Sequence, residues 1–314
     1  MNNDNINNNQ KKILVTGAKG QLGKKIIEIL GKNHQLILTD SDDMDITDIE
    51  AIRRVVELEK PDFIIHGAAY TQVDKAEEMV EICRKVNAFG TENVAKIAKE
   101  YDVPLIYIST DFVFDGEKTT PYTEDDKANP LSVYGLTKYE GEEFIRNICE
   151  KYYICRIAWL FGELPEGHPG TNFVEVMLRL AGERDSLNVV ADQVGSPTYT
   201  GDLVEMLAVL VGSQQSVVGS DDSKLQTSNC KQIPYGTYHF SGTGAASWYD
   251  FAKEIFTQTN TKIDLKAITS DQYPQKATRP KYSYMDKSKI EKALNIKVRP
   301  WQEMLADYIA KRNK

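Results

Sequence analysis

The stretch KILVTGAKGQLGKKIIEILGK, residues 12–32, decides what kind of fold the chain adopts. It opens with a short apolar run typical of a buried strand and continues with apolar residues at helical spacing. Between the two parts lie Gly17, Gly20 and Gly23. At this spacing the first glycine permits a tight turn, the second lets the backbone approach a pyrophosphate, and the third lets helix and strand pack closely. The pattern predicts a strand, a phosphate-binding turn and a helix whose N-terminal amides face a dinucleotide. A purely structural glycine turn is the alternative.

Asp40 ends the second expected strand, residues 34–40. A carboxylate at this position hydrogen-bonds a ribose 2′-hydroxyl and repels a 2′-phosphate, which favours NADH over NADPH. Lys19 in the glycine turn could still accommodate a phosphate. The other expected cofactor contacts around this turn are Gln21, Leu22, Asp45 and Ile46. The last two could flank the adenine, or they could be an acid at a helix start beside a core residue.

Strand-like and helical segments alternate along the first half of the chain. Further strands are expected at residues 62–69, 103–110 and 152–162, and helices at residues 47–60, 76–102 and 132–150. The strands are almost continuously apolar, as strands buried on both faces are. The alternation predicts an α/β fold, a Rossmann-like doubly wound parallel sheet with helices on both faces.

The second half alternates less regularly and predicts a smaller C-terminal substrate-binding lobe. We expect a disordered leader at residues 1–11 and a dinucleotide-binding domain at 12–161, to which 187–212 and 236–242 return. The lobe would comprise 162–186 and 243–314, and the Ser-, Asp-, Gln- and Gly-rich segment 213–235 would be a flexible insertion.

Composition excludes several classes of function. The 314 residues carry a net charge of −8, which disfavours nucleic acid or an anionic membrane as a partner. The four cysteines show no metal-ligand spacing, so no metal ligands are assigned. No apolar run is long enough for a membrane helix and no signal peptide is evident, so a cytoplasmic location is expected.

A second motif lies further along the chain, where Thr110 and Asp111 follow the fourth expected strand. Ligands of open α/β sheets bind outside the carboxyl ends of the strands, so these side chains are expected in the site. Tyr134 and Lys138 begin the next helix, four residues apart and therefore on one face. The Thr110 hydroxyl, the Tyr134 phenol and the Lys138 ammonium could thus converge beside a nicotinamide.

The combined motifs resemble a known family. The chain is similar to extended short-chain dehydrogenases/reductases, and most to the dTDP-4-dehydrorhamnose reductases, in TGAKGQLG, HGAAYTQVDKAE, NAFGTENVA, ISTDFVFDG, YGLTK and ADQVGSPT. The Asn-rich leader and the segment 212–234 depart from the family. The resemblance implies reduction of the C4 ketone of dTDP-4-dehydro-L-rhamnose to dTDP-L-rhamnose by NADPH or NADH, in dTDP-rhamnose biosynthesis.

The resemblance also implies roles for particular residues. Tyr134 would protonate the substrate oxygen, and Lys138 would lower the pKa of that tyrosine and bind the nicotinamide ribose. Thr110 would hydrogen-bond the substrate oxygen. Asp111 would orient the sugar, unless it only caps the strand end. Asn87 would support the backbone of the active site, and no histidine is given a catalytic role.

Further contacts are expected on the resemblance, each with a structural alternative. Ala68, Ala69 and Tyr70 would lie along the cofactor, or serve helix packing and a surface loop. Trp159 would stack on the sugar ring or belong to the core. Asn172 would contact substrate or cap a helix, and Arg279 would bind the pyrophosphate or remain a solvated loop residue.

Other functions stay open at this point. Phe112 stands where related dehydratases carry a glutamate, so simple reduction is favoured over water elimination. A reductase or epimerase acting on another nucleotide sugar is the alternative, as is a non-catalytic regulatory subunit resembling that of methionine adenosyltransferase. The preference between NADH and NADPH, a divalent ion such as Mg²⁺ and a homodimer are left undecided.

Overall fold

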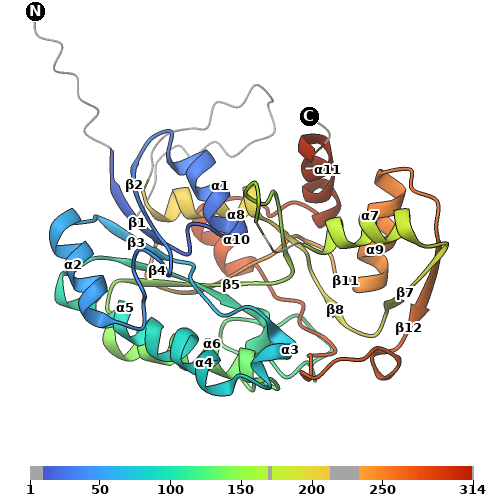
Figure 1. The fold of residues 1–314 in the computed structure, drawn as a ribbon, viewed down its shortest axis with the longest axis horizontal. Helices are drawn as coiled ribbons and strands as arrows, with labels where there is room; N and C mark the ends of the chain where they lie inside the picture. Colours follow the sequence, from blue (N-terminus) through green and yellow to red (C-terminus); the bar gives the residue numbers. More distant parts are fainter. Residues whose placement is uncertain (1–9, 169–171, 213–232, 313–314) are drawn as a thin grey trace, which may run out of the picture.

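The computed structural model describes residues 10–168, 172–212 and 233–312. Most of the expected leader and most of the expected insertion lie outside these residues. A six-stranded parallel sheet forms the centre, in the order β10-β5-β4-β3-β1-β2 (Figure 1). Its strands are β1 (Lys12–Thr16), β2 (Gln35–Thr39), β3 (Phe63–His66), β4 (Leu105–Thr110), β5 (Tyr152–Ile157) and β10 (Gly236–Phe240). The predicted Rossmann-like fold is confirmed.

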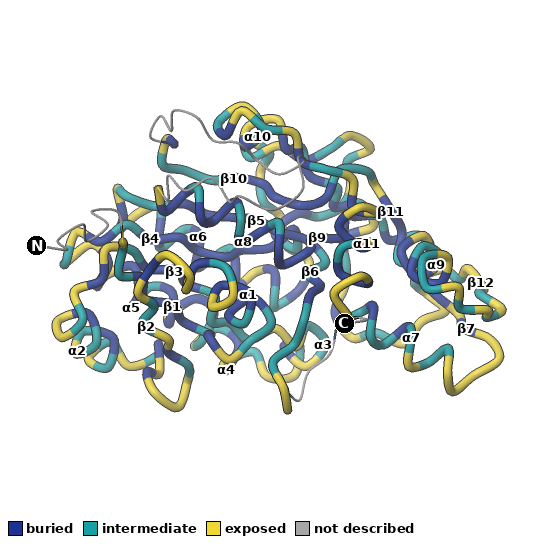
Figure 2. Tube along the Cα trace, turned by 90° about the horizontal axis from the view of Figure 1, so that it is seen from above, coloured by how far each residue is buried: buried dark blue, intermediate teal, exposed yellow. Residues whose placement is uncertain are grey.

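Helices cover both faces of the sheet because strand side chains alternate between the faces. In β1, Ile13 and Val15 belong to the core on the side of α1 (Gln21–Leu30) and α8 (Thr200–Leu210), whereas Leu14 belongs to the opposite core. That second core is closed by α2 (Ile49–Glu59), α5 (Thr91–Glu100) and α6 (Val133–Ile148). The central strands are buried, while β2 at the sheet edge is partly exposed (Figure 2).

The strand order reverses between β1 and β3. These two strands lie side by side in the sheet, although β2 lies between them in the sequence. At such a switch point the loops leaving the two strands diverge and open a crevice at the carboxyl edge. The fold therefore places the glycine turn and the loops after β3 and β4 around one space.

The remaining elements build the smaller part of the molecule and its connections. They are α7 (Phe173–Glu183), β6 (Leu160–Phe161), β7 (Ser186–Val190), β8 (Val194–Gly195), β9 (Thr198–Tyr199), β11 (Ala246–Ser247), α9 (Trp248–Gln258), β12 (Asp264–Ile268), α10 (Ser288–Leu294) and α11 (Trp301–Arg312). There are also two 3₁₀ turns, η2 (Asp111–Val113) and η3 (Ser270–Gln272). No helix in the described ranges is long and apolar enough to cross a membrane.

One expected return to the central sheet is wrong. Residues 187–190 belong to β7, which pairs in parallel with β12 in a separate two-stranded sheet. The apolar side chains of β7 pack against α7 and α9, so they are buried without a place in the main sheet. In contrast, β10 pairs with β5, and α8 packs on α1. The domain boundaries themselves stay a prediction.

Two expected elements are interrupted. The helix predicted at 76–102 consists of α3 (Val73–Ala76), α4 (Val80–Arg84), a π-helical turn η1 (Lys85–Gly90) and α5. The strand predicted at 152–162 divides into β5 and β6 at Trp159, whose φ of 48° is left-handed. Both interruptions border the crevice, as irregular backbone at functional sites often does.

Candidate active site

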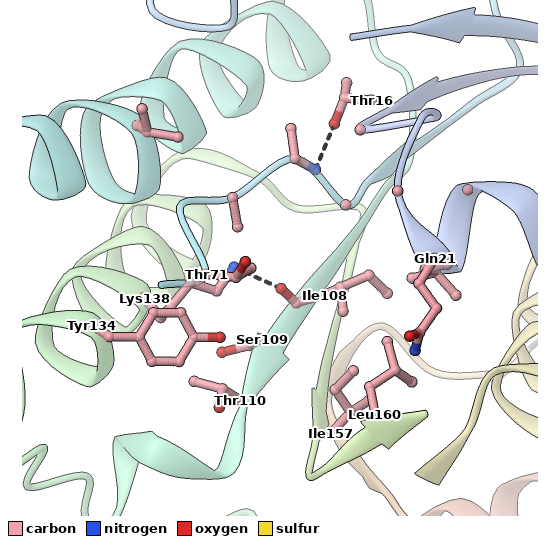
Figure 3. A pocket seen from close by; sticks show the side chains of 18 of the residues that line it. Thr16, Gln21, Thr71, Ile108, Ser109, Thr110, Tyr134, Lys138, Ile157 and Leu160 are labelled. Atoms are coloured by element: carbon pink, nitrogen blue, oxygen red, sulfur yellow. Dashed lines mark hydrogen bonds between the residues drawn. The ribbon is translucent and has the colours of Figure 1, made fainter. Parts of the chain in front are cut away.

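A cavity of about 940 Å³ lies at the carboxyl ends of β1, β3, β4 and β5 (Figure 3). This volume is in the range of small-molecule and cofactor sites. Among the predicted site residues, those that line it are Gly17, Gly20, Gln21, Leu22, Gly23, Asp40, Asp45, Ile46, Ala68, Ala69, Thr110, Asp111, Tyr134, Lys138, Trp159 and Arg279. The structure thus gathers both halves of the predicted site into one space.

The glycine turn has the geometry of a phosphate cradle. Gly17 has a φ of 73°, and a Cβ there would lie 2.8 Å from the Ala68 nitrogen. A Cβ on Gly23 would lie 2.2 Å from the Ala18 oxygen, so α1 approaches the turn as closely as only glycine allows. Gly20 is the N-cap of α1 without a side-chain capping bond. The first-turn amides are therefore left for a ligand, and the residues present fit a dinucleotide.

The wall beside the glycine turn is held by a buried chain of hydrogen bonds. The Thr16 hydroxyl lies 2.7 Å from His66 Nδ1 and accepts from the Ala68 amide at 3.2 Å (Figure 3). His66 Nε2 lies 3.0 Å from the Thr91 hydroxyl, and burial lowers the pKa of His66 to about 3. A neutral imidazole with partners on both nitrogens is a structural group. It fixes the small residues after β3 beside the cavity.

Asp40 lies at the end of β2, where a ribose is expected. Its two carboxylate oxygens accept from the Lys19 amide at 3.0 Å and the Ser41 amide at 2.8 Å. The Lys19 ammonium is 3.0 Å from Asp42. The acid therefore also ties β2 to the glycine turn, and the one lysine of that turn is already paired with a carboxylate.

Thr110, Tyr134 and Lys138 converge in the inner part of the cavity. Figure 3 shows the Tyr134 phenol beside Ser109 and Thr110, with Lys138 on the same helix behind it. The Lys138 Nζ donates to the Ile108 oxygen at 2.7 Å and lies 4.0 Å from the centre of the Tyr107 ring. Ser132 caps α6 by accepting from the Gly135 amide at 3.1 Å, which fixes where the helix begins.

The predicted lowering of the tyrosine pKa is not observed. Burial raises the pKa of Tyr134 well above its ordinary value, and the Thr110 hydroxyl offsets this only in part. Burial also lowers the pKa of Lys138 to about 7, against the opposing charge of Glu142. For the phenol, desolvation outweighs the Thr110 hydrogen bond because the side chain is fully enclosed. The phenol is therefore a protonated donor across the neutral range.

Asp111 is enclosed rather than solvated at the strand end. Its carboxylate accepts from the Ser283 hydroxyl at 2.6 Å and the Thr110 hydroxyl at 3.2 Å. Burial raises the pKa of Asp111 to about 6 despite these bonds. Ser283 lies far along the chain, and no local pattern marks it in the sequence.

A buried ion pair lies behind the reactive helix face. Arg156 donates to both oxygens of Glu142, at 2.9 and 2.7 Å, and the Ser109 hydroxyl donates to the same carboxylate. Both charged side chains are almost fully enclosed, with exposed fractions of 2% and 0%. Because Glu142 is one turn after Lys138, this pair fixes α6 against β4 and β5. Neither residue is marked by a local pattern in the sequence.

The outer part of the cavity is aromatic and basic. Trp159 stacks on Trp248 with ring centres 3.7 Å apart, and both rings line the cavity. Arg279 also lines it, held by Asp74 through two bonds of 3.0 and 2.6 Å. Trp248 is the first residue of α9, directly after the N-cap Ser247, and it was not among the expected site residues.

Two predicted site residues are not among those lining the cavity. Asn172 is the N-cap of α7, accepting from the Glu175 amide at 3.1 Å and donating to the Gly162 oxygen at 2.8 Å. Of the two expected roles of Asn172, contact with substrate or capping of a helix, the structure shows the helix cap. The Tyr70 backbone is held by Asn87, which accepts at 2.7 Å and donates at 3.1 Å. This bond pair gives Asn87 the supporting role that was expected of it.

The spacing of Tyr134 and Lys138 is not unique in the chain. Tyr249 and Lys253 repeat it in α9, away from the cavity lining. The Tyr134 pair is distinguished by its place at the carboxyl edge of the sheet, not by its spacing.

Within the described parts of the chain no cluster of three or more His, Cys, Asp or Glu side chains could hold a metal ion, so the structure does not support Mg²⁺.

The fold and site together define a dinucleotide-binding α/β protein of the short-chain dehydrogenase/reductase class. Residues 11–313 match the family model described as RmlD substrate binding domain. A dTDP-4-dehydrorhamnose reductase from Aggregatibacter actinomycetemcomitans is 39% identical over 302 residues, 94% of this chain and 97% of the relative.

Two crystal structures agree with this similarity. A dTDP-4-dehydrorhamnose reductase from Clostridium acetobutylicum superposes with a TM-score of 0.86 at 40% identity, covering 96% of this chain and 100% of the other. The enzyme from Bacillus anthracis, in complex with NADP, gives a TM-score of 0.86 at 36% identity over 96% and 99%. The chain belongs to the dTDP-4-dehydrorhamnose reductase family.

Proposed function

We propose that the chain reduces the C4 ketone of dTDP-4-dehydro-L-rhamnose to the alcohol of dTDP-L-rhamnose, using NADPH or NADH. The observation that carries this proposal is one cavity lined both by the glycine turn and by Thr110, Tyr134 and Lys138. Family membership supports the substrate, since the relatives are named for this reaction.

The bound nicotinamide supplies a hydride to the substrate carbon. The Tyr134 phenol donates a proton to the ketone oxygen, so that C=O becomes CH–OH and the phenolate is left on the tyrosine. Its raised pKa keeps the phenol protonated until the substrate ketone oxygen, which becomes more basic as the carbon is reduced, can accept the proton. Lys138, with its pKa lowered to about 7, exchanges protons readily near neutrality and can help to restore the phenol.

Thr110 and Asp111 act on the position of the substrate. The Thr110 hydroxyl accepts from the Phe112 amide at 3.2 Å and has one hydrogen to donate. That hydrogen bonds Asp111 in this structure and would turn to the ketone oxygen when substrate is present. Phe112 stands where related dehydratases carry a glutamate, and it packs edge-on against Tyr134 with ring centres 5.6 Å apart. The acid that would follow Asp111 in a dehydratase is therefore missing at this position, which favours simple reduction.

The cofactor half supports a nicotinamide dinucleotide of either kind. Asp40 favours a free 2′-hydroxyl, whereas the similar structure from Bacillus anthracis contains NADP. We propose that both cofactors are used, with NADH bound at least as well, because Lys19 is paired with Asp42. Comparing the dissociation constants of NADH and NADPH tests this, and a strong preference for NADPH would contradict it.

The reaction is tested by oxidation of NADPH and NADH with enzymatically made dTDP-4-dehydro-L-rhamnose. We expect stoichiometric turnover by the wild type and a kcat about 10²- to 10⁴-fold lower in Tyr134→Phe, the usual contribution of a general acid. Tyr249→Phe is the matched control, because it removes the same hydroxyl from a pair of the same spacing outside the cavity, and should leave kcat unchanged.

Each rival function predicts a different result. Full kcat in Tyr134→Phe would show that the proton donor is misassigned. An epimerase would interconvert sugars while retaining its cofactor, without net oxidation. A regulatory subunit would turn over no 4-keto nucleotide sugar at all.

We also propose that the protein is a homodimer. Large apolar side chains are exposed on adjoining elements, Ile82 on α4, Phe89 on η1 and Leu136 on α6. Burying such a patch against a second copy would remove it from water. Sedimentation velocity should show a dimer that Phe89→Asp dissociates, and a monomeric wild type would refute the proposal.

A further inference from the structure

Asp74 joins two segments that are far apart in the sequence. It belongs to the short helix α3 after β3, and its carboxylate accepts from the amides of Lys276 at 2.9 Å and Ala277 at 3.0 Å. The same carboxylate accepts from Arg279 Nη1 at 3.0 Å and Nη2 at 2.6 Å. One acid thus fixes both the backbone of the 275–279 loop and the side chain that this loop carries into the cavity wall.

The hydrogen-bond donors of Arg279 are only partly used by the protein. Nη1 donates to Asp74, with Gln275 at 3.0 Å and the Ala277 oxygen at 3.2 Å also in range. Nη2 donates to Asp74 alone, and Nε has no hydrogen-bond partner among the described residues. The end of the guanidinium fork is therefore taken, while its side, made of Nε–H and the second Nη2–H, remains for a ligand.

Two parallel N–H groups match the oxygens of a phosphate. A diphosphate also needs a cation in a chain of net charge −8. The described basic side chains that line the cavity are Lys19, Lys138, His168 and Arg279. Lys19 is paired with Asp42, and Lys138 is enclosed beside the proton donor. Arg279 is the arginine among them, on the outer wall near the Trp159 and Trp248 pair.

We propose that Asp74 is a positioning residue that fixes Arg279, so that the free side of the guanidinium receives the diphosphate of the nucleotide sugar. The assignment rests on the proposed function for the nature of the substrate. Its physical basis is preorganisation, because a guanidinium already held at one end loses little freedom when it binds at the other. The hydrogen bonds from Arg279 lower the pKa of Asp74 to about 2, so the Asp74 carboxylate that holds Arg279 stays ionised at neutral pH.

The test is a double-mutant cycle on binding of dTDP and UDP, measured by calorimetry without turnover. Asp74→Asn puts an amide N–H against the Arg279 donors, and we expect about tenfold weaker binding of both nucleotides. Arg279→Met should weaken binding by about 10- to 100-fold, and adding Asp74→Asn to it should cost nothing more. Binding of thymidine, which has no phosphate, should be unchanged throughout.

Lys276→Met is the matched control, because it removes only the ion pair of the same loop with Glu78. It should leave all dissociation constants within about twofold, as exposed ion pairs contribute little. In turnover, Asp74→Asn should raise KM for the sugar nucleotide with kcat unchanged, since only binding is affected.

Two results would overturn the assignment. Independent, multiplying losses in the cycle would show that Asp74 does not act through Arg279. An equal loss of thymidine affinity would show that Asp74 merely holds the loop together. Failure of the proposed function has a different readout, because the wild type would then show no turnover. Since UDP is tested beside dTDP, the diphosphate test stays valid even if the protein prefers uracil to thymine.

Discussion

Glu142 shows how a single buried carboxylate can hold an active site without touching substrate. It is fully enclosed and bonded to Arg156, Arg146 and Ser109. Although burial alone would raise the pKa of Glu142, the charges and hydrogen bonds of the two arginines hold it below its ordinary value. The carboxylate is thus ionised, and it links the helix of Tyr134 to two central strands.

Replacing this residue should be costly, and its neighbour provides the comparison. Glu142→Gln leaves Arg156 buried without its counter-charge, so we expect the free energy of unfolding to fall by about 3–5 kcal/mol. Glu143→Gln removes a half-exposed partner of Arg146 and should cost less than about 1 kcal/mol. Urea unfolding of both variants measures the difference, and equal losses would show that the buried pair is not special.

At the scale of elements, the π-helical turn η1 and the reactive helix α6 pack unusually closely. A Cβ on Gly141 would lie 2.8 Å from both the Asn87 oxygen and the Tyr107 hydroxyl. The extra residue of a π turn bulges the backbone, and here it brings Asn87 to the Tyr70 backbone and to Thr137, at 3.2 Å, one residue before Lys138. The irregular turn therefore connects the β3 loop to the catalytic helix.

Gly141→Ala should push the two elements apart. We expect a loss of about 1–3 kcal/mol in stability from overpacking, together with reduced kcat, because α6 carries Tyr134 and Lys138. Gly182→Ala in α7 is the matched variant, since beyond the chain neighbours and nearby helix backbone no atom of the described residues lies within 4 Å of the added carbon. It should gain up to about 1 kcal/mol from helix propensity. Thermal unfolding and turnover measurements on both variants test this expectation. A stable and active Gly141→Ala variant would refute the close packing of η1 and α6.

At the scale of the whole molecule, buried histidines make the fold sensitive to acid. Burial lowers the pKa of His66 and of His239 to about 3 each. Unfolded histidine takes up a proton near pH 6.5, so between about pH 6.5 and 3 only the unfolded chain is protonated at these sites. Stability from both residues is therefore lost as the pH falls through this window.

We expect about 2 kcal/mol less unfolding free energy at pH 5 than at pH 7 for each histidine. Asp111, whose pKa burial raises to about 6, opposes this by about 1 kcal/mol, because its folded form binds a proton more readily. Urea unfolding at the two pH values measures the sum. His239→Gln should shrink the difference by about 2 kcal/mol, and an unchanged difference would contradict the assignment.

Several features of the protein follow from local sequence. The glycine turn, the apolar strands and the helical spacing between them predict the nucleotide-binding sheet, because turn geometry and burial on two faces constrain neighbouring residues directly. Strand length likewise predicts Thr110 at a strand end, and the spacing of Tyr134 and Lys138 predicts that they share one helix face. These are short-range properties, and the structure places all three in the cavity.

The rest was decided by contacts between distant residues. Asp74 meets Arg279, Asp111 meets Ser283, Glu142 meets Arg156 and Trp159 meets Trp248 only after the chain has folded. The direction of the Tyr134 pKa belongs here too, since it depends on how completely the site is enclosed. Sequence determined the fold and the reactive groups, because backbone geometry and periodicity are local. Tertiary structure alone decided how those groups are charged and held, because burial and pairing depend on what else packs around them.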